Sequence, residues 1–411
     1  MKKQDKTDSA VEYSLGRDWF WKYYEKSKYN VYQAEYYERM AEEYHDDTFK
    51  RKSEKTLNCA KVWYLDYYKK NRIKNIKGIL RCNDNFCYVC QSLKAQRRFE
   101  IYSPILKELE KDYDIYHVVY TVPNVSGKRL KWTLDKMTEA HRTMIRYFSG
   151  NAKVKGIPFE IFGYYGAVRA LEITTGKRRA HGDFHPHFHC MYILRKGMNL
   201  PKIVINSFSK TKTKNGEILP KRKFSVLEVI LQKVWCMLML NIPVTKENLN
   251  NLRELTGGKY KDGFDVVAND AKGKYKEIFK YAIKGTYKNE KIFSYEDLEY
   301  LYFALKNRRT YQTYGCLQKH NFNKIDDIFS PKMQTDYLYN IFLQVLQSRE
   351  KPIYIESCLE EILKDFEPRK GEKRKPIRYI GPATLRRAFS GLTEEEQQEA
   401  LKRLIETLEG K

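Results

Sequence analysis

The stretch "HGDFHPHFHCMYIL", residues 181–194, holds four of the chain's eight histidines within nine residues. Three of these histidines alternate with other residues and then run into an apolar segment. Alternate residues of a β-strand project to the same face, so His187 and His189 point together while Phe188 is buried on the other side. Pro186 cannot donate to a sheet, and we take it as the start of the strand. The stretch predicts a strand with a histidine-bearing face.

Two imidazoles on one face can hold a divalent cation, and such a cation also needs an anionic ligand. The upstream segment "RALEITT" places Glu172 among apolar residues, where a carboxylate is costly unless it pairs or binds a metal. The alternative is a salt bridge from Glu172 to Arg169 or a nearby lysine. We rank His187 and His189 as ligands with Glu172, and His185 as a third candidate or a group behind the ligands.

The segments around this strand alternate between strand and helix patterns. Segments 113–124, 163–176 and 263–269 are rich in β-branched or aromatic residues and predict strands. Segments 133–150, 226–240 and 274–287 have helical periodicity, with Thr133 as a possible N-cap. Strands and helices in this order predict an α+β fold, with helices packed on an antiparallel sheet.

Three cysteines lie close together in "RCNDNFCYVC", and a fourth lies upstream in "LNCAKVW". The spacing of Cys82, Cys87 and Cys90, with Cys59 as the second arm, suits a closed tetrahedral zinc site. The alternative is a set of buried free thiols. We expect a zinc-binding segment over residues 56–98.

The formal net charge of +25 points to a polyanion, and nucleic acid is the commonest such partner. Tyrosine occurs 33 times, and aromatic rings among basic side chains suit stacking on unpaired bases. No apolar run is long enough for a membrane span, and the first residues do not form a signal peptide. The sequence therefore predicts a cytoplasmic DNA-binding protein without membrane contact.

Both ends of the chain extend beyond the segments with evident chemistry. Residues 1–55 predict a helical N-terminal extension. Residues 326–411 predict a helical C-terminal accessory region, in which "IESCLEEILKDF" is read as a helix and Thr393 with Glu396 as a capping box. The segment 99–325 between them is expected to be catalytic.

The segment "KEIFKYAIKGTY" adds a possible nucleophile. Glu277, Tyr281 and Lys284 are spaced i, i+4 and i+7, on one face of a helix. A tyrosine hydroxyl can attack a phosphate and form a covalent ester that keeps the bond energy for rejoining. The alternative is an amphipathic helix with ordinary surface charges.

The segments "HVVYTVPN", "LEIT…HPHFH" and "EIFKYAIK", in this order, resemble the three motifs of HUH endonucleases, and in particular those of the Rep_1 family of rolling-circle plasmid replication initiators. The cysteine block resembles that family's N-terminal region. The resemblance covers roughly residues 56–320. It departs from the family at Asp183 and Phe184, and at Gly285 and Thr286, which leaves Tyr287 as a weak alternative nucleophile.

The resemblance implies an HUH-type antiparallel sheet with flanking helices and a role for each motif. Tyr281 would be the nicking nucleophile and Lys284 its helper, while Glu277 would activate water at termination. His187, His189 and Glu172 would hold Mg²⁺ or Mn²⁺, and Thr121 and Asn124 would pack or contact DNA near the site.

The implied activity is a metal-dependent endonuclease and strand transferase that nicks a plasmid double-strand origin at single-stranded or hairpin DNA. It would leave a 5′-phosphotyrosyl link and a 3′-OH primer for a host polymerase, with a host helicase, because the chain lacks a P-loop pattern. The alternatives are an HUH transposase or relaxase of another mobile element, and a non-catalytic zinc-containing DNA-binding regulator.

Overall fold

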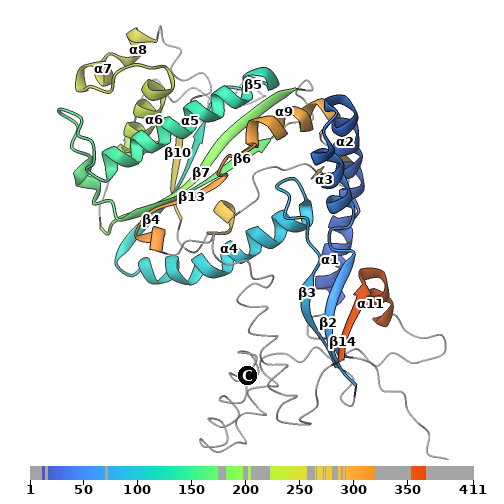
Figure 1. The fold of residues 1–411 in the computed structure, drawn as a ribbon. Coiled ribbons are helices and arrows are strands. Elements are labelled where there is room, and N and C mark those ends of the chain that lie inside the picture. The colour runs from blue at the N-terminus through green and yellow to red at the C-terminus, as the bar shows by residue number, and fades with distance from the viewer. Residues whose placement is uncertain are drawn as a thin grey trace, which may run out of the picture. The chain divides into compact units, whose positions relative to one another are not determined.

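The computed structural model describes residues 12–13, 17–69, 73–174, 182–197, 202–204, 223–256, 264, 266–271, 273, 275–279, 286–287, 290–291, 293–319 and 353–366. The chain divides into two compact units. Unit 1 draws on residues 1–101 and 326–411, and unit 2 on residues 102–325. Figure 1 shows both, coloured along the chain. Each unit is described by itself below.

Unit 1 combines three N-terminal helices with a small sheet. The helices are α1 (Arg17–Ser27), α2 (Tyr29–Tyr44) and α3 (Asp47–Leu57), and the last of them ends two residues beyond the segment that the sequence predicts to be helical. The sheet has the order β1 (Glu12–Tyr13), β3 (Ile73–Ile79), β2 (Val62–Tyr68), β14 (Ile353–Cys358).

Strand β14 comes from the C-terminal part of the chain and pairs antiparallel with β2 along six residue pairs, from Ile353 opposite Tyr67 to Cys358 opposite Val62. Helix α11 (Leu359–Asp365) follows directly. The prediction of a helix over the whole of "IESCLEEILKDF" is therefore wrong at its start. The other predicted C-terminal helices lie outside the described residues.

The core of unit 1 joins both parts of the chain. Phe20 of α1, Trp63 and Leu65 of β2, and Ile362 of α11 are all fully buried in one cluster. Burial of side chains of this size stabilises a fold by about 1.5–3 kcal/mol each. Residues more than 290 positions apart in the sequence therefore depend on each other for burial.

Unit 2 is built on one antiparallel sheet, as the sequence predicts. Its strands lie in the order β10 (Val266–Asp270), β4 (Tyr113–Thr121), β7 (Asp183–Arg195), β6 (Gly166–Thr174), β13 (Tyr311–Gly315), with β5 (Val125–Ser126) paired to the beginning of β7. Strand β7 is central, and its residues alternate between partly exposed and buried from Asp183 to Cys190. The sheet thus has a histidine-bearing face and an apolar face.

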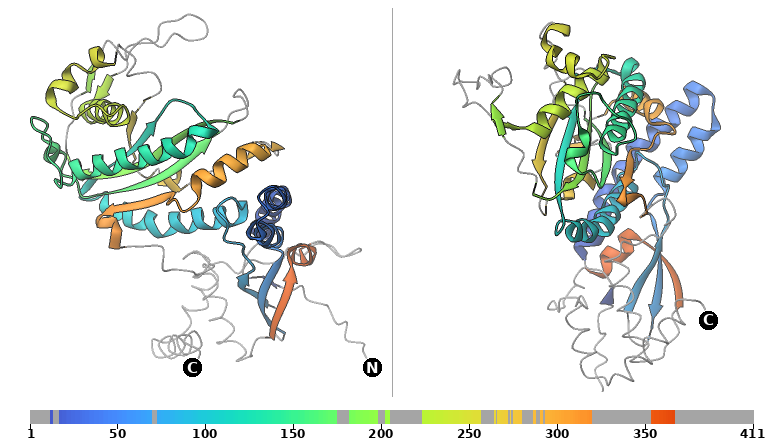
Figure 2. Two further views of the ribbon diagram at one scale, coloured as in Figure 1. Left: turned by 45° about the horizontal axis from the view of Figure 1, so that its top comes forward. Right: turned by 90° about the vertical axis from the view of Figure 1, so that its left-hand side faces the viewer.

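The apolar face is covered by α5 (Gly127–Phe148) and α6 (Val226–Met239), which pack against each other and against the sheet (Figures 1 and 2). The Trp235 indole lies 4.9 Å from the Tyr120 ring and 6.3 Å from the Phe188 ring, measured between centroids. Its Nε1–H donates to the Thr121 carbonyl at 2.8 Å. These contacts fix the end of β4 beside β7.

Three predicted boundaries are wrong. The helix predicted over residues 274–287 is contradicted at its end: Tyr275–Phe279 form the 3-10 helix η4, and Thr286–Tyr287 form strand β11. Helix α5 begins at Gly127, after Ser126, so Thr133 is a buried residue inside the helix and not its N-cap. Strand β7 begins at Asp183, so Pro186 lies within the strand. Pro186 is opposite Ile173 of β6, whereas β4 pairs with β7 only as far as His187. A proline is tolerated there because no β4 residue lies opposite it.

The remaining described helices are short or lie at the margins of unit 2. They are η1 (Phe159–Phe162), α7 (Lys246–Asn250), α8 (Leu252–Leu255), η4 (Tyr275–Phe279), α9 (Tyr295–Leu305) and η5 (Cys316–Lys319). Helix α4 (Tyr88–Leu109) leads from unit 1 into unit 2. Within the described ranges, no helix combines the length and the apolar character needed to cross a membrane.

Candidate metal centre and its surroundings

Glu172, His187 and His189 come together on one face of the sheet in unit 2. Glu172 is directly opposite His187 in the pairing of β6 with β7, and residues opposite each other in a sheet share a face. The Glu172 Oε2 atom lies 2.6 Å from Nε2 of His187 and 2.6 Å from Nε2 of His189. Two imidazole nitrogens and a carboxylate oxygen are a donor set that suits a divalent transition metal or Mg²⁺ with added water. We call these residues the trio.

The trio is largely shielded from solvent. The Glu172 side chain is 4% exposed, and those of His187 and His189 are 13% and 14% exposed. The alternative partner Arg169 lies on the opposite face, where its guanidinium packs over the Phe188 ring at 4.6 Å. A carboxylate buried to this degree is stable when its charge is matched, and the two histidines or a cation between them provide that match.

The far nitrogens of both histidines are also engaged. The Nδ1 atom of His187 lies 3.2 Å from the His185 carbonyl oxygen, and Nδ1 of His189 lies 3.0 Å from Nε2 of His117. If each Nδ1–H donates to these acceptors, each Nε2 keeps a lone pair directed at Glu172 and at any ion bound there. Partners of this kind orient metal-binding histidines and raise their basicity.

His185 shares the face of the trio but lies to one side of it. Its Nδ1 atom is 2.7 Å from Oδ1 of Asn124, and the Asn124 amide donates to Asp183 at 3.4 Å. Its ring is therefore directed toward the loop after β4, while its carbonyl supports His187. Thr121, the other first-motif residue, is opposite His187 in the sheet.

The segment that leads to Tyr281 lies over the same face. Helix η4 packs against β6 and β7, and its last residue, Phe279, stacks on Tyr102 of α4 at 5.8 Å and lies 6.3 Å from the Tyr311 ring. Tyr311 is opposite Ala170, which is itself opposite His189. Glu277 lies in η4. Tyr281 and Lys284 lie outside the described residues, and Tyr287 is part of β11 (Thr286–Tyr287).

Behind β7, the apolar face holds a buried polar network. His141 of α5 faces Cys190 at 3.2 Å and Tyr192 at 3.4 Å through Nε2, and the Tyr192 hydroxyl pairs with that of Tyr120 at 2.8 Å. Burial lowers the pKa of His141 well below its usual range, and the positive charge of Arg169 lowers it further. The ring is therefore neutral at pH 7.

In unit 1, the four predicted cysteines form a second group that could hold a metal ion. Their Sγ atoms are separated by 3.5 Å for Cys87 and Cys59, 3.6 Å for Cys59 and Cys90, and 3.7 Å for Cys82 and Cys90. None of them forms a disulfide. A zinc ion with four Zn–S bonds of about 2.3 Å needs S–S separations of about 3.8 Å. The thiols are already close to that arrangement.

The pKa values of the four thiols are also shifted in different directions. Hydrogen bonds from the other three thiols lower the pKa of Cys90, whereas hydrogen bonding with Cys82 and burial raise that of Cys59. A cluster that stabilises one thiolate is prepared for a cation. Cys59, Cys87 and Cys90 are buried in the same core as Trp63, so an ion here would brace the unit.

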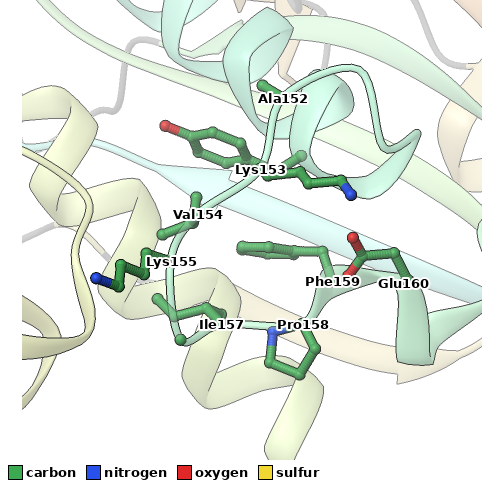
Figure 3. A pocket seen from close by; sticks show the side chains of 10 residues that line it. Ala152, Lys153, Val154, Lys155, Ile157, Pro158, Phe159 and Glu160 are labelled. Carbon is green, nitrogen blue, oxygen red and sulfur yellow. The ribbon is translucent and has the colours of Figure 1, made fainter.

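The structure also shows a hollow of about 550 Å³ at the other end of unit 2, lined by Tyr147 and residues 152–160 (Figure 3). It follows the C-terminal end of α5, whereas Asn124 precedes the N-terminal end. Lys153, Lys155 and Glu160 are its charged side chains, and no group of metal-binding residues in the described ranges lies there. This hollow is separate from the trio.

Sequence reasoning missed His117. The face of the strand on which His117 lies could have been inferred, because His117 and Thr121 are four residues apart in one strand and therefore share a face. However, a lone histidine in an apolar strand gives no sign of its partner until the register of β4 against β7 is known.

Comparisons with known proteins agree with the motifs. Residues 73–199 match the family model Rep_1, described as a replication protein. The chain is 28% identical over 191 residues to a "Protein rep" of Bacillus sp. and 27% identical over 221 residues to a "Protein rep" of Bacillus amyloliquefaciens. These alignments cover 45% and 52% of this chain, and it spans about half of each relative, 54% and 55%. No solved structure was found to match. The family model and both relatives confirm the resemblance: residues 73–199 carry the domain of the Rep_1 plasmid replication proteins.

Proposed function

We propose that this chain initiates rolling-circle replication of a plasmid by nicking one strand of its double-strand origin. The observation that supports this most strongly is the trio, with η4 lying over the same face two residues before Tyr281.

Glu172, His187 and His189 would hold the divalent cation, Mg²⁺ or Mn²⁺. When bound, such an ion draws charge from a scissile phosphate and orients its oxygens. His117 and the His185 carbonyl hold the two imidazoles in place. Asn124, beside His185, and Thr121, at the end of the neighbouring strand, would pack or contact DNA near the site.

Tyr281 is the proposed nucleophile. Its hydroxyl oxygen bonds to phosphorus while the bond from phosphorus to the 3′ oxygen of the preceding nucleotide breaks. The tyrosine proton passes to Glu277 or to water, and the leaving 3′ oxygen takes up a proton from solvent. Lys284 neutralises the phosphate. The step is a transesterification, so the bond energy is kept for rejoining the strand.

The free 3′-OH would prime a host polymerase, with strand separation by a host helicase. In unit 1, the four cysteines would hold a structural zinc ion that stabilises the fold around them.

A covalent-adduct assay tests the nuclease proposal. The purified chain is incubated with overlapping single-stranded oligonucleotides covering the replicon that encodes it, with Mn²⁺ or with EDTA, and adducts are resolved on denaturing gels. The native chain should form an adduct with a specific oligonucleotide only when metal is present. Tyr281→Phe should form none, whereas the matched control Tyr287→Phe should retain it.

A double His187→Ala, His189→Ala variant should lose adduct formation by at least about a hundredfold, because the metal contribution is removed. Adduct formation by Tyr281→Phe would transfer the role to another residue. Full activity in EDTA would remove the trio from the mechanism.

A further inference from the structure

The first turns of α5 carry a basic and aromatic surface that the reaction above does not use. Its members are Lys128, Arg129, Lys131, Trp132 and Lys136, which we call the α5 patch. The Trp132 side chain is 60% exposed, more than any other large hydrophobic residue in the described part of the chain. Exposing an indole to this extent forgoes burial that would stabilise the fold, so the position calls for a functional explanation.

The cations of the α5 patch form no salt bridge among the described residues, although Asp135 and Glu139 lie on the same helix. Lys128, Arg129 and Lys131 are exposed. Lys136 lies over the Trp132 ring at 5.0 Å from its centroid. The nearby acidic residue Asp135 is paired with Arg308 at 2.5 Å. Three exposed cations thus precede Trp132 on the same helix, and a fourth, Lys136, lies over its ring.

The α5 patch begins close in sequence to the loop that contacts His185, although α5 itself covers the face of the sheet opposite the trio. Lys128 is four residues after Asn124, whose side chain meets His185. The start of the helix is fixed against β7, because the Gly127 amide donates to the Gly182 carbonyl at 2.7 Å and a Cβ at Gly127 would collide with the Tyr300 ring. The position of the α5 patch relative to the trio is therefore held by the fold.

We propose that the α5 patch binds the single-stranded DNA next to the nicked bond, with Trp132 stacking on an unpaired base and the basic side chains contacting phosphates. This inference rests on the proposed function, and it names the part of unit 2 that holds the substrate strand.

Stacking argues for a single strand and not for a duplex. In a duplex the base faces are occupied by neighbouring base pairs, whereas unpaired bases offer a free face to an aromatic ring. Lys136 lies against one face of the indole, so a base would stack on the other. Lysine and arginine contacts to phosphates add affinity without reading sequence, which suits a strand whose sequence is specified elsewhere.

The experiment measures binding by fluorescence anisotropy with the full chain, using a labelled single-stranded dT20 and a labelled 20-base-pair duplex. All measurements are made without added Mg²⁺ or Mn²⁺ at several salt concentrations, so that no nicking takes place and the cysteine site is left undisturbed. Trp132→Ala should weaken dT20 binding about 5- to 150-fold, the range known for losing one base stack. Trp132→Phe should retain most of the affinity. Duplex binding should change less than twofold in both variants.

A triple variant tests the charges. Replacing Lys128, Arg129 and Lys131 with Ala should reduce the dependence of log K on log salt concentration by about 2, at about 0.7 for each lost phosphate contact. The matched control replaces Lys153, Lys155 and Arg195 with Ala, which removes two lysines and one arginine that are exposed at the opposite end of β7. This control should keep the native salt slope.

Unchanged dT20 binding by Trp132→Ala would overturn the proposal, as would an equal loss on dT20 and duplex, which would make the surface a duplex site. A chain that forms no covalent adduct but loses dT20 binding on Trp132→Ala would disprove the nuclease and leave the α5 patch standing. Circular dichroism and thermal melting confirm that each surface variant is folded.

Discussion

At His189, one ring nitrogen faces Glu172 and the other faces His117. We expect His117→Ala to weaken Mn²⁺ binding 10- to 100-fold, the usual effect of losing a partner behind a metal ligand. Titration calorimetry of the full chain measures the change. His117→Gln, which still offers an acceptor to Nδ1–H, should recover part of the affinity. Equal Mn²⁺ affinity in His117→Ala and the native chain would show that His117 does not orient the ligand.

His141 makes a different residue-scale prediction, because it is neutral in the folded protein and its pKa is lowered by burial. In the unfolded chain a histidine protonates below about pH 6.5. The neutral His141 side chain therefore contributes fully to the free energy of unfolding above that pH. Its contribution decreases as the pH falls, by up to about 1.4 kcal/mol per pH unit. Urea unfolding at pH 7, 6 and 5 should show a shallower loss for His141→Gln. The matched control is His45→Gln at an exposed histidine.

Individual residues of the candidate metal centre differ in how well their roles can be predicted from the sequence. The alternation of His187 and His189 needs only the two-residue period of a strand, so their shared face could be predicted. The roles of His117 and His185 could not, because they depend on which residue of one strand lies opposite which residue of another. That register arises from packing across the whole sheet.

At the scale of elements, η4 is held over the sheet by the stack of Phe279 on Tyr102. Phe279→Leu keeps an apolar side chain but removes the ring stack, so the segment leading to Tyr281 should lose its fixed position. We expect adduct formation to slow by about 10- to 100-fold, because small displacements of a nucleophile are costly, while Mn²⁺ affinity stays within twofold. A proportional loss of adduct formation and of Mn²⁺ affinity would mean that the substitution disturbs the sheet itself.

The long strands β4, β6, β7 and the helix α6 follow from their apolar patterns, and all were predicted within a few residues. Helix α4 was not predicted, because Pro104 lies inside it and the spacing of apolar residues changes along the helix. Residues 353–358 have the composition of a short amphipathic segment, and only the open side of β2 makes them a strand. Elements whose form depends on a distant partner are the ones that local patterns miss.

For the whole molecule, we expect the stability of unit 1 to depend on both β14 and the proposed zinc ion. Deleting residues 351–411 should abolish the thermal unfolding transition that belongs to unit 1 and release zinc, while unit 2 still unfolds cooperatively. Removing zinc with a chelator should lower the same transition in the full chain, because binding energy is folding energy at such a site. Lys74→Ala, which breaks the surface pair with Asp365 at 2.7 Å, should cost less than about 1 kcal/mol.

Calorimetry with parallel zinc quantification makes this measurement. A deletion variant that keeps its zinc and both unfolding transitions would show that β14 does not contribute to the stability of unit 1.

The pairing of β14 with β2 also sets an order in time. Tyr68 ends β2 and Ile353 begins β14, a separation of 353 − 68 = 285 residues. At about 5–20 residues per second, the ribosome delivers β14 roughly 15–60 s after β2 has emerged. Unit 2 lies wholly between them and can fold during that interval. Unit 1 is therefore completed last. A prematurely terminated chain would carry the trio of unit 2 but an incomplete unit 1 around the four cysteines.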